Sequence, residues 1–194
     1  MLYSLHMNTL TKEILGTVRS IGIALCIVFF IRIFIFQPFL VSGESMYPTF
    51  NNGDYLIVDE VTYRFKEPKR GDVVIFKYPE NPKRFFIKRI IGLPGETIIF
   101  KNNEVYIQTN TTADMVKLSE PYINQITIPI NGTEQKIETD HYFVMGDNRG
   151  FSLDSRAWGQ LPKENIVGVA GLRLFPLSAI SYRPGSLEHF ENKE

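Results

Sequence analysis

The chain has 194 residues, enough for one domain of ordinary size or for one domain that carries a smaller insert. Its 21 Lys and Arg balance 21 Asp and Glu, so no net field favours nucleic acid as a partner. Cys26 is the only cysteine, which excludes an internal disulfide, and the three histidines lack zinc-type spacing. We therefore expect no metal and no cofactor.

Residues 14–36 form the first recognisable element, a mostly apolar segment. It exceeds the about 20 residues that a membrane span needs. Arg19 and Arg32 lie towards its ends, where a long side chain reaches the headgroups. Gln37-Pro38 then predicts the end of the helix. We predict a transmembrane anchor here, after a cytoplasmic N-terminus at residues 1–13.

Two alternatives exist for this segment. A cleaved signal peptide fits poorly, because Arg32 and the bulky residues 33–36 are unsuited to a cleavage region. A buried core helix fits poorly because apolar residues occupy every face. Lys12 and Arg19 mark the cytoplasmic side, and no Lys or Arg occurs between Gln37 and Tyr55. The positive-inside rule thus predicts a single-pass protein of the cell membrane, in contact with membrane lipid, whose remainder is extracytoplasmic.

From Gly53 onward the sequence consists of short β-rich runs separated by turn residues. The predicted strands lie at residues 55–58, 73–76, 85–91, 105–107, 142–145 and 166–174. Asn102-Asn103 and Asn131-Gly132 predict hairpin turns. No long amphipathic helix follows the anchor, so we predict a mainly β protein with antiparallel sheets.

The predicted body has two parts and a tail. Residues 96–140 are richer in Asn, Thr, Gln and Glu, and we interpret them as a smaller inserted β lobe. Residues 37–95 and 141–183 form the predicted β core. The polar residues 184–194 are predicted to be a loose tail.

Ser45 is the candidate nucleophile, in the stretch from Ser42 to Thr49. A serine hydroxyl is a weak acid and needs a base beside it. His141 is the only histidine within the strand-rich body, and a simple turn residue is the more ordinary interpretation of it.

Lys88 is the alternative base. On a strand it shares a face with Phe86 and Ile90, and burial among such neighbours lowers the pKa of a lysine and favours the neutral amine. By pattern alone, a solvated lysine on a half-exposed strand is the commoner case.

A polar cluster at residues 146–156 follows a predicted strand directly. Asp154 and Arg156 can pair and shape the loop, and Ser152 can hold the lysine amine. The ordinary alternative is a surface turn rich in local hydrogen bonds.

Together these stretches resemble bacterial type I signal peptidases of the short, single-span kind found in Gram-positive bacteria. The resemblance covers nearly the whole chain. Its motifs are the anchor, Ser45-Met46-Tyr47-Pro48-Thr49, Gly53-Asp54, Arg70-Gly71-Asp72-Val73-Val74, residues 88–96 (Lys-Arg-Ile-Ile-Gly-Leu-Pro-Gly-Glu), and Gly146-Asp147-Asn148-Arg149 with Ser152, Asp154, Ser155 and Arg156.

The resemblance implies a membrane-bound serine endopeptidase that removes signal peptides from secreted preproteins through an acyl-enzyme. It assigns Ser45 as nucleophile and Lys88 as general base, with Ser152 orienting the lysine. Its supporting residues are Asp147, Asn148, Asp154 and Arg156. The fold it implies is a β catalytic core with a smaller inserted β lobe.

The resemblance also suggests how the oxyanion and the substrate are held. The Ser45 N–H is the expected oxyanion donor. Some family members add a serine hydroxyl two residues earlier, where this chain has Gly43, which offers only backbone. Signal peptides carry small residues at the first and third positions before the cut, so the pockets must be shallow and apolar. The suggested walls are Val41, Met46, Phe50, Phe86 and Ile87.

Two rival functions remain at this point. Self-cleaving repressors use a similar Ser/Lys arrangement, but they are soluble and carry a DNA-binding domain. A membrane-tethered, non-catalytic β module that binds exported peptides is the other alternative. It would lack one residue of the dyad, whereas Ser45 and Lys88 are both present.

Overall fold

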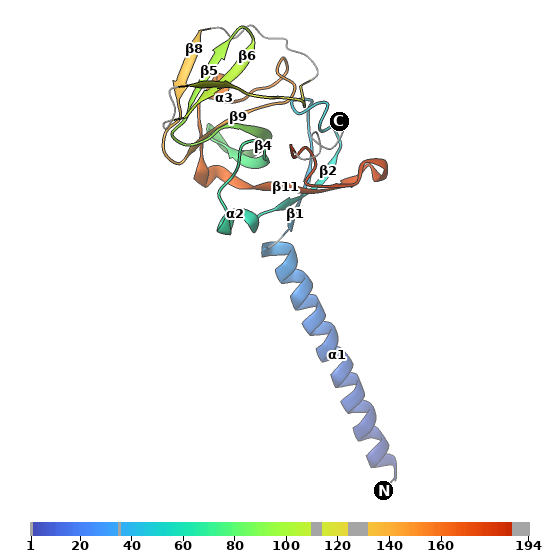
Figure 1. The fold of residues 1–194 in the computed structure, drawn as a ribbon. Coiled ribbons are helices and arrows are strands. Elements are labelled where there is room, and N and C mark those ends of the chain that lie inside the picture. The colour runs from blue at the N-terminus through green and yellow to red at the C-terminus, as the bar shows by residue number, and fades with distance from the viewer. Residues whose placement is uncertain (1, 35, 110–113, 124–131, 188–194) are drawn as a thin grey trace. The chain divides into compact units, whose positions relative to one another are not determined.

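The computed structural model describes residues 2–34, 36–109, 114–123 and 132–187 (Figure 1). Side chains are described from residue 11 to 28 and, within these ranges, from residue 37 onward. The chain divides into two units, Met1–Gln37 and Pro38–Glu194, which are taken separately below.

The first unit consists mainly of one helix, α1 (Leu2–Phe34). Its described side chains, from residue 11 to 28, are all exposed, including Ile21 and Leu25. Among the described residues, no helix reaches the length and hydropathy of a membrane span. The anchor at residues 14–36 therefore stays a prediction, and the side chains of residues 29–36 lie outside the described set.

The second unit is built on an antiparallel sheet with the strand order β1-β2-β11-β3-β4-β9-β10, in which β12 also pairs with β11. Its strands are β1 (Phe36–Leu40), β2 (Tyr55–Asp59), β3 (Val73–Tyr78), β4 (Asn81–Gly92), β9 (His141–Met145), β10 (Leu161–Pro162), β11 (Ile166–Phe175) and β12 (Ser181–Tyr182). The short helices are α2 (Thr62–Phe65), α3 (Ser155–Trp158), η1 (Lys163–Asn165) and η2 (Leu177–Ala179). The prediction of a mainly β, antiparallel protein is confirmed.

A second sheet lies between β4 and β9 in the chain, with the order β7-β6-β5-β8. Its strands are β5 (Thr97–Lys101), β6 (Glu104–Gln108), β7 (Met115–Lys117) and β8 (Thr133–Lys136). Asn102 and Asn103 join β5 to β6 with φ of 53° and 62°, as a tight hairpin turn with two positive φ angles requires. The other predicted turn, Asn131-Gly132, begins at a residue outside the described ranges.

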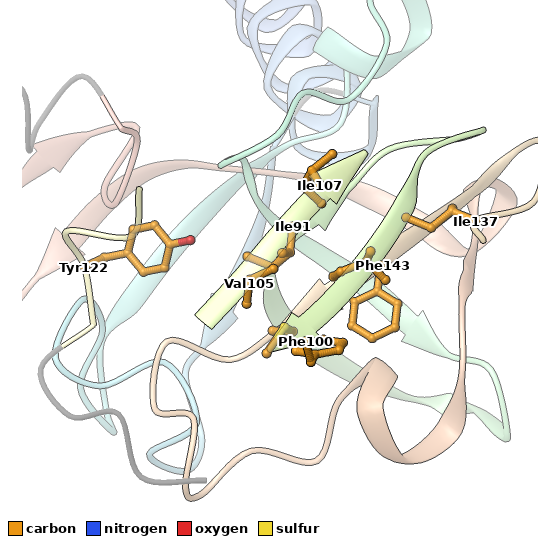
Figure 2. Packing of buried hydrophobic residues seen from close by; sticks show 9 residues of the cluster. Ile91, Phe100, Val105, Ile107, Tyr122, Ile137 and Phe143 are labelled. Carbon is orange, nitrogen blue, oxygen red and sulfur yellow. The ribbon is translucent and has the colours of Figure 1, made fainter. Parts of the chain in front are cut away.

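The two sheets share a buried core. Ile98 and Ile107 of the small sheet pack with Ile91 and Met145 of the large one. Phe100 and Phe143 meet in this core, with ring centroids 5.9 Å apart (Figure 2). The hydrophobic effect therefore fixes the small sheet against the strands that carry the candidate base.

The end of the chain corrects one expectation. The loose tail predicted from residue 184 does not begin there, because Pro184 and Gly185 are buried. The Gly185 carbonyl accepts a hydrogen bond of 2.5 Å from Arg89 Nη1. Residues 188–194, the rest of the predicted tail, lie outside the described residues.

Candidate active site

Ser45 lies in the turn segment that follows β1. Met46 and Phe50, which both follow Ser45, are almost fully buried, and the Phe50 N–H bonds to the Met46 carbonyl. Since these two residues anchor the turn in the core, they hold Ser45, which directly precedes Met46, at the surface of the core, where the residue is half-buried.

Lys88 lies on β4 and reaches Ser45. Its Nζ is 2.7 Å from Ser45 Oγ and 2.9 Å from the Ile87 carbonyl oxygen. The residue is 4% exposed, and the Phe86 ring lies 5.4 Å from Nζ. Burial lowers the pKa of Lys88 to about 8, although the negative charges of Asp154 and Asp147 oppose the shift. A minor neutral fraction at neutral pH, which becomes substantial at mildly alkaline pH, follows, as a lysine base requires.

Asp154 and Arg156 form the pair suggested by the sequence. Arg156 Nε and Nη2 each lie 2.7 Å from an Asp154 carboxylate oxygen. The carboxylate also accepts the Gly146 N–H at 3.0 Å. Burial alone raises the pKa of Asp154, but these donors more than offset burial, so the pKa lies below its ordinary value. Asp154 is therefore a fixed negative charge close to Lys88.

Ser152 does not hold the lysine amine, contrary to the sequence-based expectation. Its buried Oγ has no hydrogen bond to Lys88 Nζ but lies close enough to Asp154 to help lower the pKa of that carboxyl. Lys88 Nζ donates instead to the Ile87 carbonyl. Ser152 instead packs against Gly146, where an added Cβ would meet Ser152 Oγ at 2.3 Å and the Ser45 carbonyl oxygen at 2.4 Å. Position 146 must therefore be glycine for the two segments to approach this closely.

Asp147 and Asn148 connect the polar loop to the Ser45 turn. The Asp147 carboxylate accepts from Thr49 Oγ1 at 2.5 Å and from Arg89 Nε at 2.8 Å. The Asn148 N–H bonds to the Ser45 carbonyl at 3.0 Å, and Asn148 Nδ2 bonds to the Glu44 carbonyl at 3.1 Å. The loop therefore holds the backbone of the candidate nucleophile directly.

Sequence reasoning included Arg89, Thr49 and Arg149 in its motifs but gave none of them a role. Arg89 is fully buried, and its Nη2 lies 2.6 Å from Asp147 Oδ2. A signal existed, because Arg89 shares a strand face with Ile87 and Ile91, and a charge on an apolar face needs a buried counter-charge.

A pocket of about 330 Å³ opens beside Ser45 and Lys88. Val41, Phe86 and Ile87 line it, as the sequence suggested. Met46 and Phe50 do not, because they are 1% and 0% exposed and belong to the core behind it. The other lining residues are Phe39, Leu40, Ser42, Gly43, Glu44, Leu56, Ile75, Arg84, Phe85, Phe151 and Leu153.

The backbone donors near Ser45 differ in availability. The Gly43 N–H donates to Asn52 Oδ1 at 3.0 Å, so it is not available to an oxyanion, and this corrects the suggested role of Gly43. The Ser45 N–H makes no hydrogen bond within the described part of the chain. His141, the alternative base, is engaged locally, with Nδ1 2.9 Å from the Thr139 carbonyl.

A family model and curated relatives similar to this chain agree on one family. The model described as "Signal peptidase, peptidase S26" matches residues 14–175. Signal peptidase I P of Bacillus subtilis subsp. natto is 38% identical over 175 residues, which cover 88% of this chain and 94% of that protein. Signal peptidase IB of Staphylococcus aureus strain MRSA252 is 34% identical over 188 residues, with 88% and 94% covered. The crystal structure of a signal peptidase I from Enterococcus faecalis V583 shares 32% identity and a TM-score of 0.44, and covers 54% of this chain and 97% of that one.

Proposed function

Because this chain belongs to the signal peptidase family, peptidase S26, we propose that it cuts signal peptides from exported preproteins with a Ser45/Lys88 dyad. Membership makes it a type I signal peptidase by enzyme class. The observation that carries the dyad is the 2.7 Å separation of Ser45 Oγ and the buried Lys88 Nζ. Such a distance permits direct proton transfer.

In the acylation step, neutral Lys88 accepts the Ser45 hydroxyl proton while Oγ attacks the scissile carbonyl. The lysine then returns this proton to the leaving amine. The C–N bond breaks, and the signal peptide remains as an ester on Ser45. The Ile87 carbonyl, which accepts a hydrogen bond from Nζ, orients the amine towards Oγ throughout.

In the deacylation step, the same amine takes a proton from a water molecule while the water oxygen attacks the ester carbonyl. The C–O bond to Ser45 then breaks, Lys88 returns the proton to Ser45 Oγ, and the signal peptide leaves as a carboxylic acid. The Ser45 N–H is the donor we assign to the oxyanion in both steps, since it has no partner among the described residues.

The substrate is proposed to bind in the apolar pocket as an extended strand, with main-chain hydrogen bonds that demand little of its side chains. Val41, Phe86 and Ile87 bound the space for the small residues before the cut. Phe39 packs against Phe85 in the wall of this pocket, with ring centroids 5.3 Å apart.

We also propose that α1 anchors the protein in the cell membrane, with its N-terminus in the cytoplasm and the catalytic unit outside. Supporting this, Ile21 and Leu25 are 55% and 64% exposed, and apolar sequence continues to Phe36. Recovery of the protein from carbonate-washed membranes tests the proposal, and recovery in the supernatant would contradict it.

Residues 96–140 are proposed as the inserted lobe.

Purified protein is expected to cut a preprotein after a small-x-small site, because signal peptides carry small residues at the first and third positions before the cut. Mass spectrometry of the products locates the cut. Ser45→Ala is the inactive control, since it removes the attacking oxygen. Normal turnover by Ser45→Ala would disprove the proposed mechanism.

The pH dependence of cleavage should report Lys88. The base must be neutral, so kcat/KM is expected to rise with pH and level off above the lysine pKa of about 8. For an enzyme that needs a protonated acid, kcat/KM would instead fall as the pH rises. A profile that is flat between pH 6 and pH 10 would exclude lysine as the titrating base.

A further inference from the structure

The segment 118–123, here called the docking segment, belongs to the lobe side of the chain but reaches the polar loop of the site. It begins directly after β7, and the Leu118 N–H bonds to the Val105 carbonyl of β6 at 2.8 Å. Tyr122 is 3% exposed and packs in the core between the two sheets, at the edge of the cluster in Figure 2. The docking segment is therefore fixed to the small sheet.

Glu120 of this segment pairs with Arg149 of the polar loop. Arg149 Nη1 lies 3.1 Å from Glu120 Oε2, and Nη2 bonds to Oε1. The two side chains are only 9% and 11% exposed. Burial alone would lower the pKa of Arg149, but the Glu120 carboxylate raises it above its ordinary value. Arg149 Nε also donates to the Gly146 carbonyl at 3.1 Å, so the pair fixes the loop backbone.

Tyr122 covers Arg89, which is the second buried cation beside the polar loop. Its ring centre lies 3.9 Å from the guanidinium carbon of Arg89, and its hydroxyl donates to Glu120 Oε1 at 2.9 Å. Arg89 in turn forms the two-bonded pair with Asp147. The aromatic face stabilises a cation that is shielded from water.

These contacts continue to the nucleophile. Asp147, Asn148 and Arg149 are consecutive in the polar loop. Asn148 bonds to the Ser45 and Glu44 carbonyls, and Asp147 bonds to Thr49. Displacement of the loop therefore displaces the backbone on both sides of Ser45 Oγ.

We propose that Glu120 and Tyr122 are positioning residues, through which the lobe sets the position of Ser45 relative to Lys88. The inference rests on the proposed Ser45/Lys88 chemistry. Neither residue lines the pocket, so we expect their main effect on the chemical step and a smaller one on the binding of the peptide. A small displacement of Ser45 Oγ relative to Lys88 Nζ is enough to lower the rate, because about 1 Å of misplacement can cost a hundredfold.

If Glu120 had only a structural role, the expected result would be different. If Glu120 only stabilised the fold, its loss would lower the unfolding midpoint, and the folded molecules would keep the wild-type kcat. The positioning role predicts a lower kcat for folded molecules with KM unchanged. Steady-state kinetics at a temperature where every variant is folded separate the two.

Glu120→Gln is the test, with Glu104→Gln as its matched control. Both substitutions remove a carboxylate of the lobe that pairs with a cation, but the Glu104–Lys117 pair is far more exposed. We expect Glu120→Gln to lower kcat about 10- to 100-fold with KM within about twofold, and Glu104→Gln to match the wild type. Glu120→Asp, which keeps the charge, should retain more kcat than Glu120→Gln.

Tyr122→Leu is the second variant, because it keeps apolar contact with the core and removes the ring from Arg89. It should show the same loss of kcat with KM unchanged, and it carries the test if Glu120→Gln does not fold. Folded Glu120→Gln or Tyr122→Leu protein with the wild-type kcat, or with a raised KM alone, overturns the proposal. Ser45→Ala is assayed in parallel: if it cleaves, the dyad fails, whereas an inactive Ser45→Ala beside a fully active Glu120→Gln refutes only the positioning role.

Discussion

Replacing Lys88 by methionine is expected to lower kcat/KM about 10²- to 10⁴-fold, the range that a positioned general base contributes. Methionine has nearly the length of lysine and no amine, and the site is 4% exposed and lies beside the Phe86 ring. The substitution removes a buried polar group without leaving a cavity, so the protein should fold. Initial rates on a preprotein, with circular dichroism as the check on folding, measure the effect.

Two further variants sharpen this prediction. Lys88→Arg should be equally inactive, because a guanidinium stays protonated at any pH of assay. Lys83→Arg, on the exposed end of the same strand, should keep full activity and so controls for the substitution itself. Activity near the wild-type level in folded Lys88→Met would show that another group removes the Ser45 proton.

Replacing Asp147 by asparagine is expected to destabilise the folded protein more than the other single substitutions proposed above. Arg89 and Asp147 are both 0% exposed at the side chain, and the substitution leaves the guanidinium without its counter-charge. Removal of one partner of a buried pair costs about 3–5 kcal/mol. The free energy of unfolding, from urea denaturation followed by circular dichroism, should fall by this amount.

The matched control is again Glu104→Gln, which breaks a more exposed pair and should change the unfolding midpoint little. The double variant Arg89→Met/Asp147→Asn gives an independent check. If an unpaired charge causes the loss, removing the arginine as well should restore much of the stability. A double variant less stable than Asp147→Asn would contradict this explanation.

The sequence by itself determined the features that depend on neighbours along the chain. Alternating apolar residues and turn chemistry predict the antiparallel strands, since side chains alternate between faces with a period of two. Asn102-Asn103 adopt the positive φ angles of the predicted hairpin, because asparagine tolerates them locally. The motifs around Ser45 and Lys88 identified the family for the same reason, that their residues are close in sequence.

Tertiary structure decided what depends on residues far apart. The neutral amine of Lys88 requires burial, which no strand pattern guarantees, and the bond to Ser45 spans 43 positions. Ser152 was expected to hold this amine, but Nζ donates to the Ile87 carbonyl and Ser152 Oγ makes no hydrogen bond to it, which depends on how the polar loop packs against β4. The support that Glu120 and Tyr122 give to the polar loop was likewise invisible, since it depends on how the two sheets pack.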